Sequence, residues 1–337
     1  MSCLKSAINV LLERGLILSF LALLLGNQGA FGQAGSSKPL RFASGQHFSG
    51  GSASMSSKSV LPSTVLKLAE SEQYLLWVEL KAGKMHLLER NAFGGMETRQ
   101  IIPVSIGKSG FGKMEEGDRK TPVGVYRLTS FLTDQQLDDF YGLGAFPLNY
   151  PNVLDRQHGR TGSGIWLHGL PKNADSRPLL DSDGCVVIAN ESLQELYQYI
   201  ETGVTHIVLS DEPLTWTESR LTETRREGLE QAFSSWKVAW ENKDNPVYLG
   251  FYAGDFSDFI RNKTQWDEYK TRVNNGKRWI SVETSNVSFF TDLKQPDMVT
   301  IRYYQDYRSS NYNWRGWKEQ LWRETDSGWQ IVYEGNG

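Results

Sequence analysis

Cysteine and histidine are scarce in this 337-residue chain, which contains two cysteines and five histidines. No Cys-x-x-Cys pair and no His-Glu-x-x-His segment occurs in the sequence, so we predict no metal site and no cofactor. The charges are also close to balanced, with a formal net charge of −3. A chain without a basic excess lacks the electrostatic footprint of a nucleic-acid binder, so we expect no nucleic-acid partner.

Long apolar runs are missing beyond the N-terminus. The most apolar stretch, residues 16–25, follows Lys5 and Arg14 and precedes the small-x-small segment at residues 30–32. This order predicts a cleaved signal peptide, residues 1–32. The run is shorter than the roughly 20 residues that span a bilayer, so we expect no membrane span after cleavage. An uncleaved N-terminal anchor is the alternative, and export to the periplasm or cell envelope is the predicted location.

One thiol carries most of the functional argument. Cleavage would remove Cys3 and make Cys185 the one cysteine of the mature chain, which indicates a reactive thiol in an exported protein. His168 lies near the end of an apolar segment that predicts a short buried strand, and Cys185 begins the next apolar run. An imidazole within hydrogen-bond reach can take the proton of a thiol nucleophile. We therefore predict a Cys185 nucleophile and a His168 base; inert packing and a structural histidine are the alternatives.

The turn before this cysteine has its own expected role. Gly184 tolerates the positive φ of a sharp turn, and such a turn could aim the N–H groups of Gly184 and Cys185 at a developing oxyanion. Asn190 follows the apolar run, and we expect its side chain to cap the N-terminus of a helix that starts at Glu191.

Two motifs resemble those of the YkuD-type L,D-transpeptidase catalytic domain. One is His168-Gly169 followed, after a spacer, by Ser-Asp-Gly-Cys at residues 182–185, and the other is EGDRKTPVGVY at residues 116–126. The resemblance covers about residues 74–210. It implies a fold built mainly of β-strands, a sandwich or barrel, and activity on peptidoglycan stem peptides.

The resemblance also implies roles for single residues. Cys185 would attack the L,D-amide after diaminopimelate in a stem tetrapeptide, with His168 as general base. D-Ala would leave, and the thioester acyl-enzyme would pass to an amine or to water. Gly169 would orient the imidazole through its carbonyl, and Ser182 would support the site.

One departure from the family pattern concerns a positive charge. Many members carry arginine two positions after the cysteine, where this chain has Val187. The surrounding run resembles the branch with the Csd6-type L,D-carboxypeptidases, which trim stem peptides and set cell shape. Transpeptidase and carboxypeptidase outputs therefore both stay open.

Substrate contacts are predicted from loops in front of the central stretch. Asn149 and Tyr150 lie in a region that forms part of the substrate groove in the resembling family. His158 and Arg160 lie in a polar loop and could meet a carboxylate of the stem peptide. Ordinary loop packing is the alternative for all four residues.

The second half of the chain has a different pattern. Apolar residues at helical spacing are followed by alternating strand-like runs, which indicates a small α+β domain. The pattern resembles the NTF2-like cone, in which a sheet wraps a helix and leaves a pocket, so we expect a small ligand there. The predicted order is signal peptide 1–32, Ser/Gly-rich lead-in 33–61, catalytic domain 62–212, linker 213–224 and NTF2-like domain 225–337.

The sequence thus predicts an exported enzyme that modifies peptidoglycan through a cysteine nucleophile. The alternative is a non-catalytic wall-binding or scaffold protein that uses the C-terminal pocket.

Overall fold

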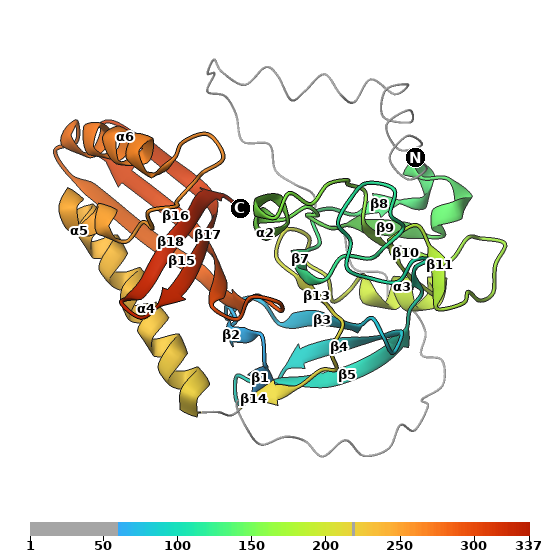
Figure 1. Ribbon diagram of the computed structural model, residues 1–337. Coiled ribbons are helices and arrows are strands. Elements are labelled where there is room, and N and C mark those ends of the chain that lie inside the picture. Colours follow the sequence, from blue (N-terminus) through green and yellow to red (C-terminus); the bar gives the residue numbers. More distant parts are fainter. Residues whose placement is uncertain (1–59, 218–219) are drawn as a thin grey trace, which may run out of the picture. The chain divides into compact units, whose positions relative to one another are not determined.

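The computed structural model describes residues 60–217 and 220–337 (Figure 1). The predicted signal peptide, Cys3 and nearly all of the predicted lead-in lie outside the described residues, as do positions 218–219 in the predicted linker. The range Lys58–Gly337 forms one compact unit. No helix in the described ranges combines the length and the apolar character needed to cross a membrane.

The first half of the described chain is dominated by short strands with few helical turns. Its elements are β1 (Leu61–Pro62), β2 (Val65–Lys67), β3 (Tyr74–Glu79), β4 (Lys84–Arg90), β5 (Met96–Pro103), β6 (Ile106–Gly107), β7 (Gly124–Arg127), β8 (Leu132–Thr133), η1 (Asp134–Gln136), η2 (Asp139–Tyr141), β9 (Gly144–Pro147), α2 (Val153–Gln157), β10 (Trp166–Gly169), β11 (Leu180–Ser182), β12 (Val186–Ile188), α3 (Asn190–Leu196), β13 (His206–Ser210) and β14 (Trp216–Thr217).

Two sheets of this half enclose a shared core. One has the strand order β5-β4-β3-β13-β7, and the other has the order β12-β10-β9-β8. The hairpin of β3 and β4 turns through Gly83, whose φ of 64° suits glycine. Leucine, isoleucine and valine side chains from both sheets meet in one buried cluster. This packing holds β10 and β12, the strands next to the predicted catalytic pair, in fixed register.

The segment from Thr133 to Gly144, predicted as a helix or lid, forms two single 3₁₀ turns, η1 and η2. Gly142 ends the second turn at a φ of 68°. A side chain there would collide with the side chain of Asn190. The chain therefore cannot continue as a helix past this point, because the glycine is held against a neighbouring segment.

The second half consists of three helices followed by long strands. Its elements are α4 (Arg220–Glu241), α5 (Asn245–Gly250), α6 (Lys263–Asn275), β15 (Ile280–Thr291), β16 (Met298–Ser309), β17 (Asn313–Thr325) and β18 (Gly328–Asn336). The predicted helical stripe of α4 is buried, and it packs against aromatic side chains of the sheet. Figure 1 shows α4 running along the antiparallel sheet formed by β15 to β18. The α+β prediction for this half is confirmed.

Strand lengths in the second half exceed the prediction. The sequence pattern indicates two separate strands, at residues 279–282 and 287–289, but residues 280–282 and 287–289 all belong to β15, and Trp279 precedes it. The pairing of β15 with β16 shifts register between Ser285 and Ser288, and Asn286 in between has a φ of 51°. A bulge therefore bends one continuous strand where the sequence pattern indicates a break.

The two halves share hydrogen bonds and core. β2, which precedes the first sheet in the chain, pairs with β15 and extends the second sheet. Phe290 of β15 belongs to a buried cluster whose other members come from the first half, among them Trp77 and Val208. The order of a mainly β domain followed by an α+β domain is thus as predicted, and apolar contacts connect the two.

Candidate active site

Two neighbouring strands bring His168 and Cys185 to one face of a sheet. β10 and β12 run parallel, with Leu167 opposite Val186 and His168 opposite Val187. Side chains alternate along a strand, so Cys185 projects on the side of Val187 and therefore on the side of His168.

The two faces of this sheet pack against different parts of the protein. Leu167 and Val186 point to the other side, into the main core of the first half. On the catalytic face, the Tyr141 ring of η2 packs against Trp166 and His168, with ring centroids 4.9 Å and 5.2 Å apart. One face of the sheet thus packs into the hydrophobic core, and on the other face an aromatic ring packs against the imidazole.

The tautomer of His168 follows from its hydrogen bond. Nδ1 lies 2.7 Å from the carbonyl oxygen of Gly169. A carbonyl can only accept, so Nδ1 carries the proton and Nε2 is left as the basic nitrogen. Burial lowers the pKa of His168 to about 4, with a further contribution from the Arg177 charge and an opposing one from the Gly169 hydrogen bond. His168 is therefore neutral at physiological pH.

The thiol of Cys185 is buried, with 2% of the residue exposed. Its Sγ lies 3.5 Å from the carbonyl oxygen of Gly164, to which the thiol donates. The sulfur is thus directed at a carbonyl in the resting structure, and the nearby His168 imidazole is neutral.

Ser182 fixes the turn that leads into the cysteine. Its hydroxyl donates to the Cys185 carbonyl at 2.6 Å and accepts from the Gly184 N–H at 3.1 Å. Gly184 has a φ of 124°, and a Cβ there would lie 2.8 Å from the Lys120 carbonyl oxygen. The Gly184 N–H donates to Ser182 in this structure, and its oxyanion role stays a prediction. A role of the Cys185 N–H in binding the oxyanion stays a prediction.

Thr121, within the upstream motif, joins that motif to the same turn. Its hydroxyl donates to the Gly184 carbonyl at 3.0 Å and accepts from the Gly107 N–H at 2.9 Å. Asp118 of the motif accepts from Lys113; burial acts to raise its pKa, but hydrogen bonds outweigh this effect and hold the pKa at about 2. The motif thus builds a loop that supports the cysteine turn.

Asn190 does not cap the helix that follows, which corrects the prediction. α3 starts at Asn190, and the residue in the capping position is Ala189. The Asn190 side chain instead accepts from the Leu143 N–H and donates to the Leu170 carbonyl, both at 3.0 Å. It thereby connects the chain after the catalytic histidine to the chain after η2.

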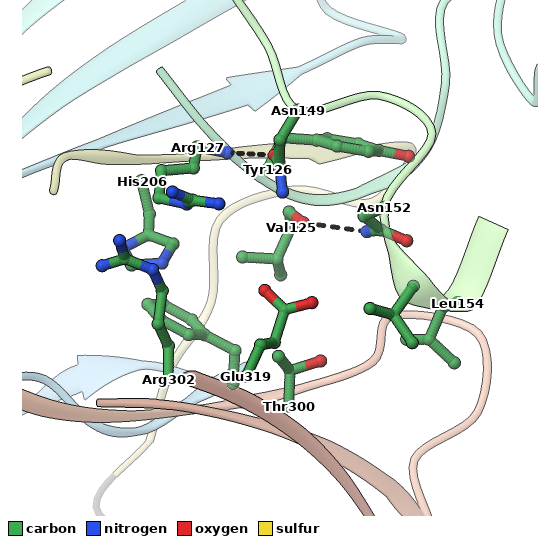
Figure 2. A pocket seen from close by; sticks show the side chains of 12 residues that line it. Val125, Tyr126, Arg127, Asn149, Asn152, Leu154, His206, Thr300, Arg302 and Glu319 are labelled. Atoms are coloured by element: carbon green, nitrogen blue, oxygen red, sulfur yellow. Dashed lines mark hydrogen bonds between the residues drawn. The ribbon is translucent and has the colours of Figure 1, made fainter. Parts of the chain in front are cut away.

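The predicted substrate contacts Asn149 and Tyr150 have structural partners. Asn149 accepts from the Arg127 N–H at 2.7 Å, and the Tyr150 hydroxyl donates to the Thr161 carbonyl at 3.1 Å. Figure 2 shows Asn149 at a cavity that Arg302 of β16 also lines. The cavity holds about 20 Å³, which is room for about one water molecule and not for a peptide.

His158 and Arg160 are also held by protein groups. His158 Nδ1 lies 2.7 Å from the Leu154 carbonyl, and Nε2 lies 2.7 Å from the Gln295 amide nitrogen. Arg160 forms a 2.7 Å ion pair with the buried carboxylate of Asp155. These partners favour the alternative of structural packing, and a contact of any of the four residues with substrate stays a prediction.

A guanidinium that the sequence did not reveal lies near the imidazole. Arg177, in the loop before β11, acts electrostatically on His168 and packs on Phe140, with Cζ 5.5 Å from the ring centroid. The chain around Arg177 carries no recognisable motif, so only the folded loop reveals it.

The second half contains a larger cavity of about 320 Å³. Its lining combines aromatic rings with lysines, including Trp240, Trp314, Lys270 and Lys318. Burial lowers the pKa of Lys318, and the Lys270 ammonium lies 3.4 Å from the carboxylate of Glu334. Within residues 60–217 and 220–337, no group of three or more His, Cys, Asp or Glu side chains is arranged to hold a metal ion.

Family models match both halves of the chain. The L,D-transpeptidase catalytic domain of the YkuD type matches residues 73–209, and the Cds6 C-terminal NTF2-like domain matches residues 228–335. The fold and the sheet that carries the cysteine and histidine thus define a YkuD-type catalytic domain followed by an NTF2-like domain.

Solved structures place the chain within a family. Bd1075 of Bdellovibrio bacteriovorus is 30% identical, with a TM-score of 0.66 over 82% of this chain and 98% of that protein. The helical cell shape determining protein Pgp2 of Campylobacter jejuni is 25% identical, with a TM-score of 0.65 over 80% of this chain and 94% of that protein. The chain belongs to the family that joins a YkuD-type L,D-transpeptidase domain to a Cds6-type NTF2-like domain.

A curated relative matches part of the chain. YafK of Escherichia coli, named as a candidate L,D-transpeptidase, is 26% identical over 133 residues, which is 38% of this chain and 46% of YafK. The match therefore spans just under half the length of that relative.

Proposed function

We propose that this protein is an exported peptidoglycan-modifying enzyme that cleaves the L,D-amide of stem tetrapeptides through a Cys185 thioester. The observation that carries the proposal is the parallel pairing of β10, which contains His168, with β12, which Cys185 directly precedes. The hydrogen bond from Nδ1 to Gly169 supports the assignment of Nε2 as the base. Membership in a family with an L,D-transpeptidase domain supports the reaction class.

The chemistry follows from a neutral thiol beside a neutral imidazole. Sγ forms a bond to the diaminopimelate carbonyl carbon while the thiol proton passes to His168 Nε2. The C–N bond then breaks, and Nε2 returns the proton to the D-Ala amine. Water or an amine attacks the thioester in the same way, and the thiol is regenerated. Because burial disfavours imidazolium, we infer proton transfer concerted with attack, without a stable thiolate–imidazolium pair.

The direct test is product analysis by mass spectrometry. The full chain is incubated with diaminopimelate-type tetrapeptide muropeptides, and loss of alanine is expected. A tripeptide product indicates a carboxypeptidase, and a cross-linked dimer indicates a transpeptidase. Cys185→Ala should abolish both products, because the acyl-enzyme cannot form. A wild-type protein that leaves the tetrapeptide intact and forms no adduct with a carbapenem at Cys185 would contradict the proposal.

The non-catalytic alternative rests on the cavity of the second half. Aromatic rings beside lysines can bind a sugar or peptide that carries a carboxylate. If the protein only binds the wall, Lys318→Met should abolish binding to isolated sacculi, while Cys185→Ala should leave the cell-shape phenotype unchanged. Lys81→Met is the control, because Lys81 pairs with Glu212 at the exposed surface.

A further inference from the structure

We propose that Arg177 binds the terminal carboxylate of the D-Ala leaving group and so selects stem peptides that end at this residue. The inference rests on the proposed function and adds a specificity residue to it. It is carried by a buried guanidinium nitrogen without a partner, in a side chain that packs on Phe140, the ring that also contacts His168.

Two hydrogen bonds and one aromatic ring fix the guanidinium of Arg177. Nε donates to the Asp181 carboxylate at 2.8 Å, Nη2 donates to the Asp181 carbonyl at 2.6 Å, and the Phe140 ring lies below the group. The side chain is 11% exposed. A guanidinium anchored in this way presents its remaining N–H groups in a fixed direction, which suits recognition of a planar carboxylate.

The remaining nitrogen is buried and has no acceptor. Nη1 of Arg177 has no hydrogen-bond partner among the described residues, although it is buried from solvent. A buried charged donor without an acceptor costs free energy, and such groups in native proteins call for an explanation. A ligand oxygen that binds during the reaction would satisfy this group.

Arg177 and His168 share a neighbouring ring, that of Phe140. Its charge acts on His168, and both side chains flank Phe140, whose ring centroid is 6.1 Å from the imidazole centroid. In the substrate, three bonds separate the scissile carbonyl carbon from the D-Ala carboxyl carbon, a span of under about 4 Å. The diaminopimelate side-chain carboxylate lies farther along the chain, so the terminal carboxylate is the nearer partner.

Arg177 would supply the positive charge that many family members have as an arginine at the position of Val187. A guanidinium from the loop before β11 supplies a cation on the same side as the catalytic pair. Because it would bind a free chain end, it would favour removal of a terminal residue over cleavage inside a longer peptide.

The test compares two peptides that differ only in charge at the chain end. The tetrapeptide with a free C-terminus should be cleaved with a kcat/KM roughly 10- to 100-fold above that of its C-terminal amide, as expected for a charge-assisted hydrogen bond. Arg177→Gln should remove this preference by slowing the free acid while changing the amide less than about threefold. Calorimetric binding of both peptides to Cys185→Ala, with and without Arg177→Gln, gives the same comparison without turnover.

Arg99→Gln is the matched control. Arg99 also pairs with one carboxylate, Glu89 at 2.6 Å, and also lies over one ring, Tyr199 at 5.0 Å, but it belongs to β5 of the other sheet. Its loss should leave both peptides unaffected. Asp181 is 38% exposed, so water can solvate it in Arg177→Gln, and the melting temperature should change little.

The outcomes separate the two proposals. Equal slowing of acid and amide by Arg177→Gln would overturn the inference and indicate a structural role. A preference that depends on the diaminopimelate side-chain carboxylate, seen with a peptide amidated only there, would also overturn it. A wild-type protein that cleaves no tetrapeptide contradicts the proposed function itself.

Discussion

At the scale of single residues, both members of the proposed catalytic pair, His168 and Cys185, are buried. His168 is enclosed by aromatic rings and keeps one hydrogen bond, to Gly169. Desolvation penalises its charged form, and the nearby Arg177 cation penalises it further. The neutral imidazole is therefore available to accept a proton over a wide pH range.

We predict that the basic form of His168 persists well below pH 6.5. The active form is the neutral imidazole, which predominates above its pKa, so the acid limb of kcat/KM should fall near pH 4. Removing the Arg177 charge should move the limb to higher pH, because imidazolium then forms more easily. NMR titration of the His168 ring in wild type and Arg177→Gln measures both values. A limb near pH 6.5 in the wild type would contradict the burial argument.

At the scale of elements, a turn and a distant loop form one unit. Ser182 closes the turn from within, and Thr121 of the upstream loop holds the Gly184 carbonyl from outside. Thr121 is completely buried, so its two hydrogen bonds are shielded from water. The two motifs are far apart in the chain, but they are in direct contact in the fold.

Thr121→Val should therefore lower both the free energy of unfolding and kcat. The valine has a similar shape but leaves the Gly184 carbonyl and the Gly107 N–H without their partner, at a cost of about 1–3 kcal/mol for each unsatisfied group. Chemical denaturation should show this loss, and kcat should fall because the cysteine turn is less constrained. Thr121→Ser keeps the hydroxyl and is the control. If the serine variant loses as much activity as the valine variant, the hydrogen bonds are not the cause.

At the scale of the whole molecule, the described chain behaves as one folded unit. β2 pairs with β15, and Phe290 of β15 packs among residues of the first half. His206 of β13 stacks on the same ring, with centroids 4.4 Å apart. We expect the two domains to unfold together.

Phe290→Ala tests this coupling. Loss of the buried ring should cost roughly 3–5 kcal/mol and split the single calorimetric transition into two. Phe256→Ala removes an equally buried ring that lies wholly within the core of the second half. It should lower stability without separating the transitions. A single transition in Phe290→Ala, with only a lower midpoint, would show that this cluster does not couple the domains.

The local pattern of apolar residues predicts most of the secondary structure. Alternating and continuous apolar runs marked most strands, and the stripe on α4 marked the helix that packs on the second sheet. Predictions were wrong where a partner distant in sequence decides the outcome. Asn190 has a typical capping residue type, but two loops offer its side chain better partners. The β15 bulge reads as a break because its residues lack an apolar pattern.

The sequence alone marked the candidate site, because a thiol, a histidine and two motifs are local features. It also determined the order of a β domain and an α+β domain, since hydrophobic periodicity depends on neighbouring residues. Only the tertiary structure decided that the Gly184 N–H is occupied, that Arg177 and His168 both contact Phe140 and that Phe290 joins the core of the first half. These contacts depend on strand register and loop packing between segments far apart in the chain, which no local pattern specifies.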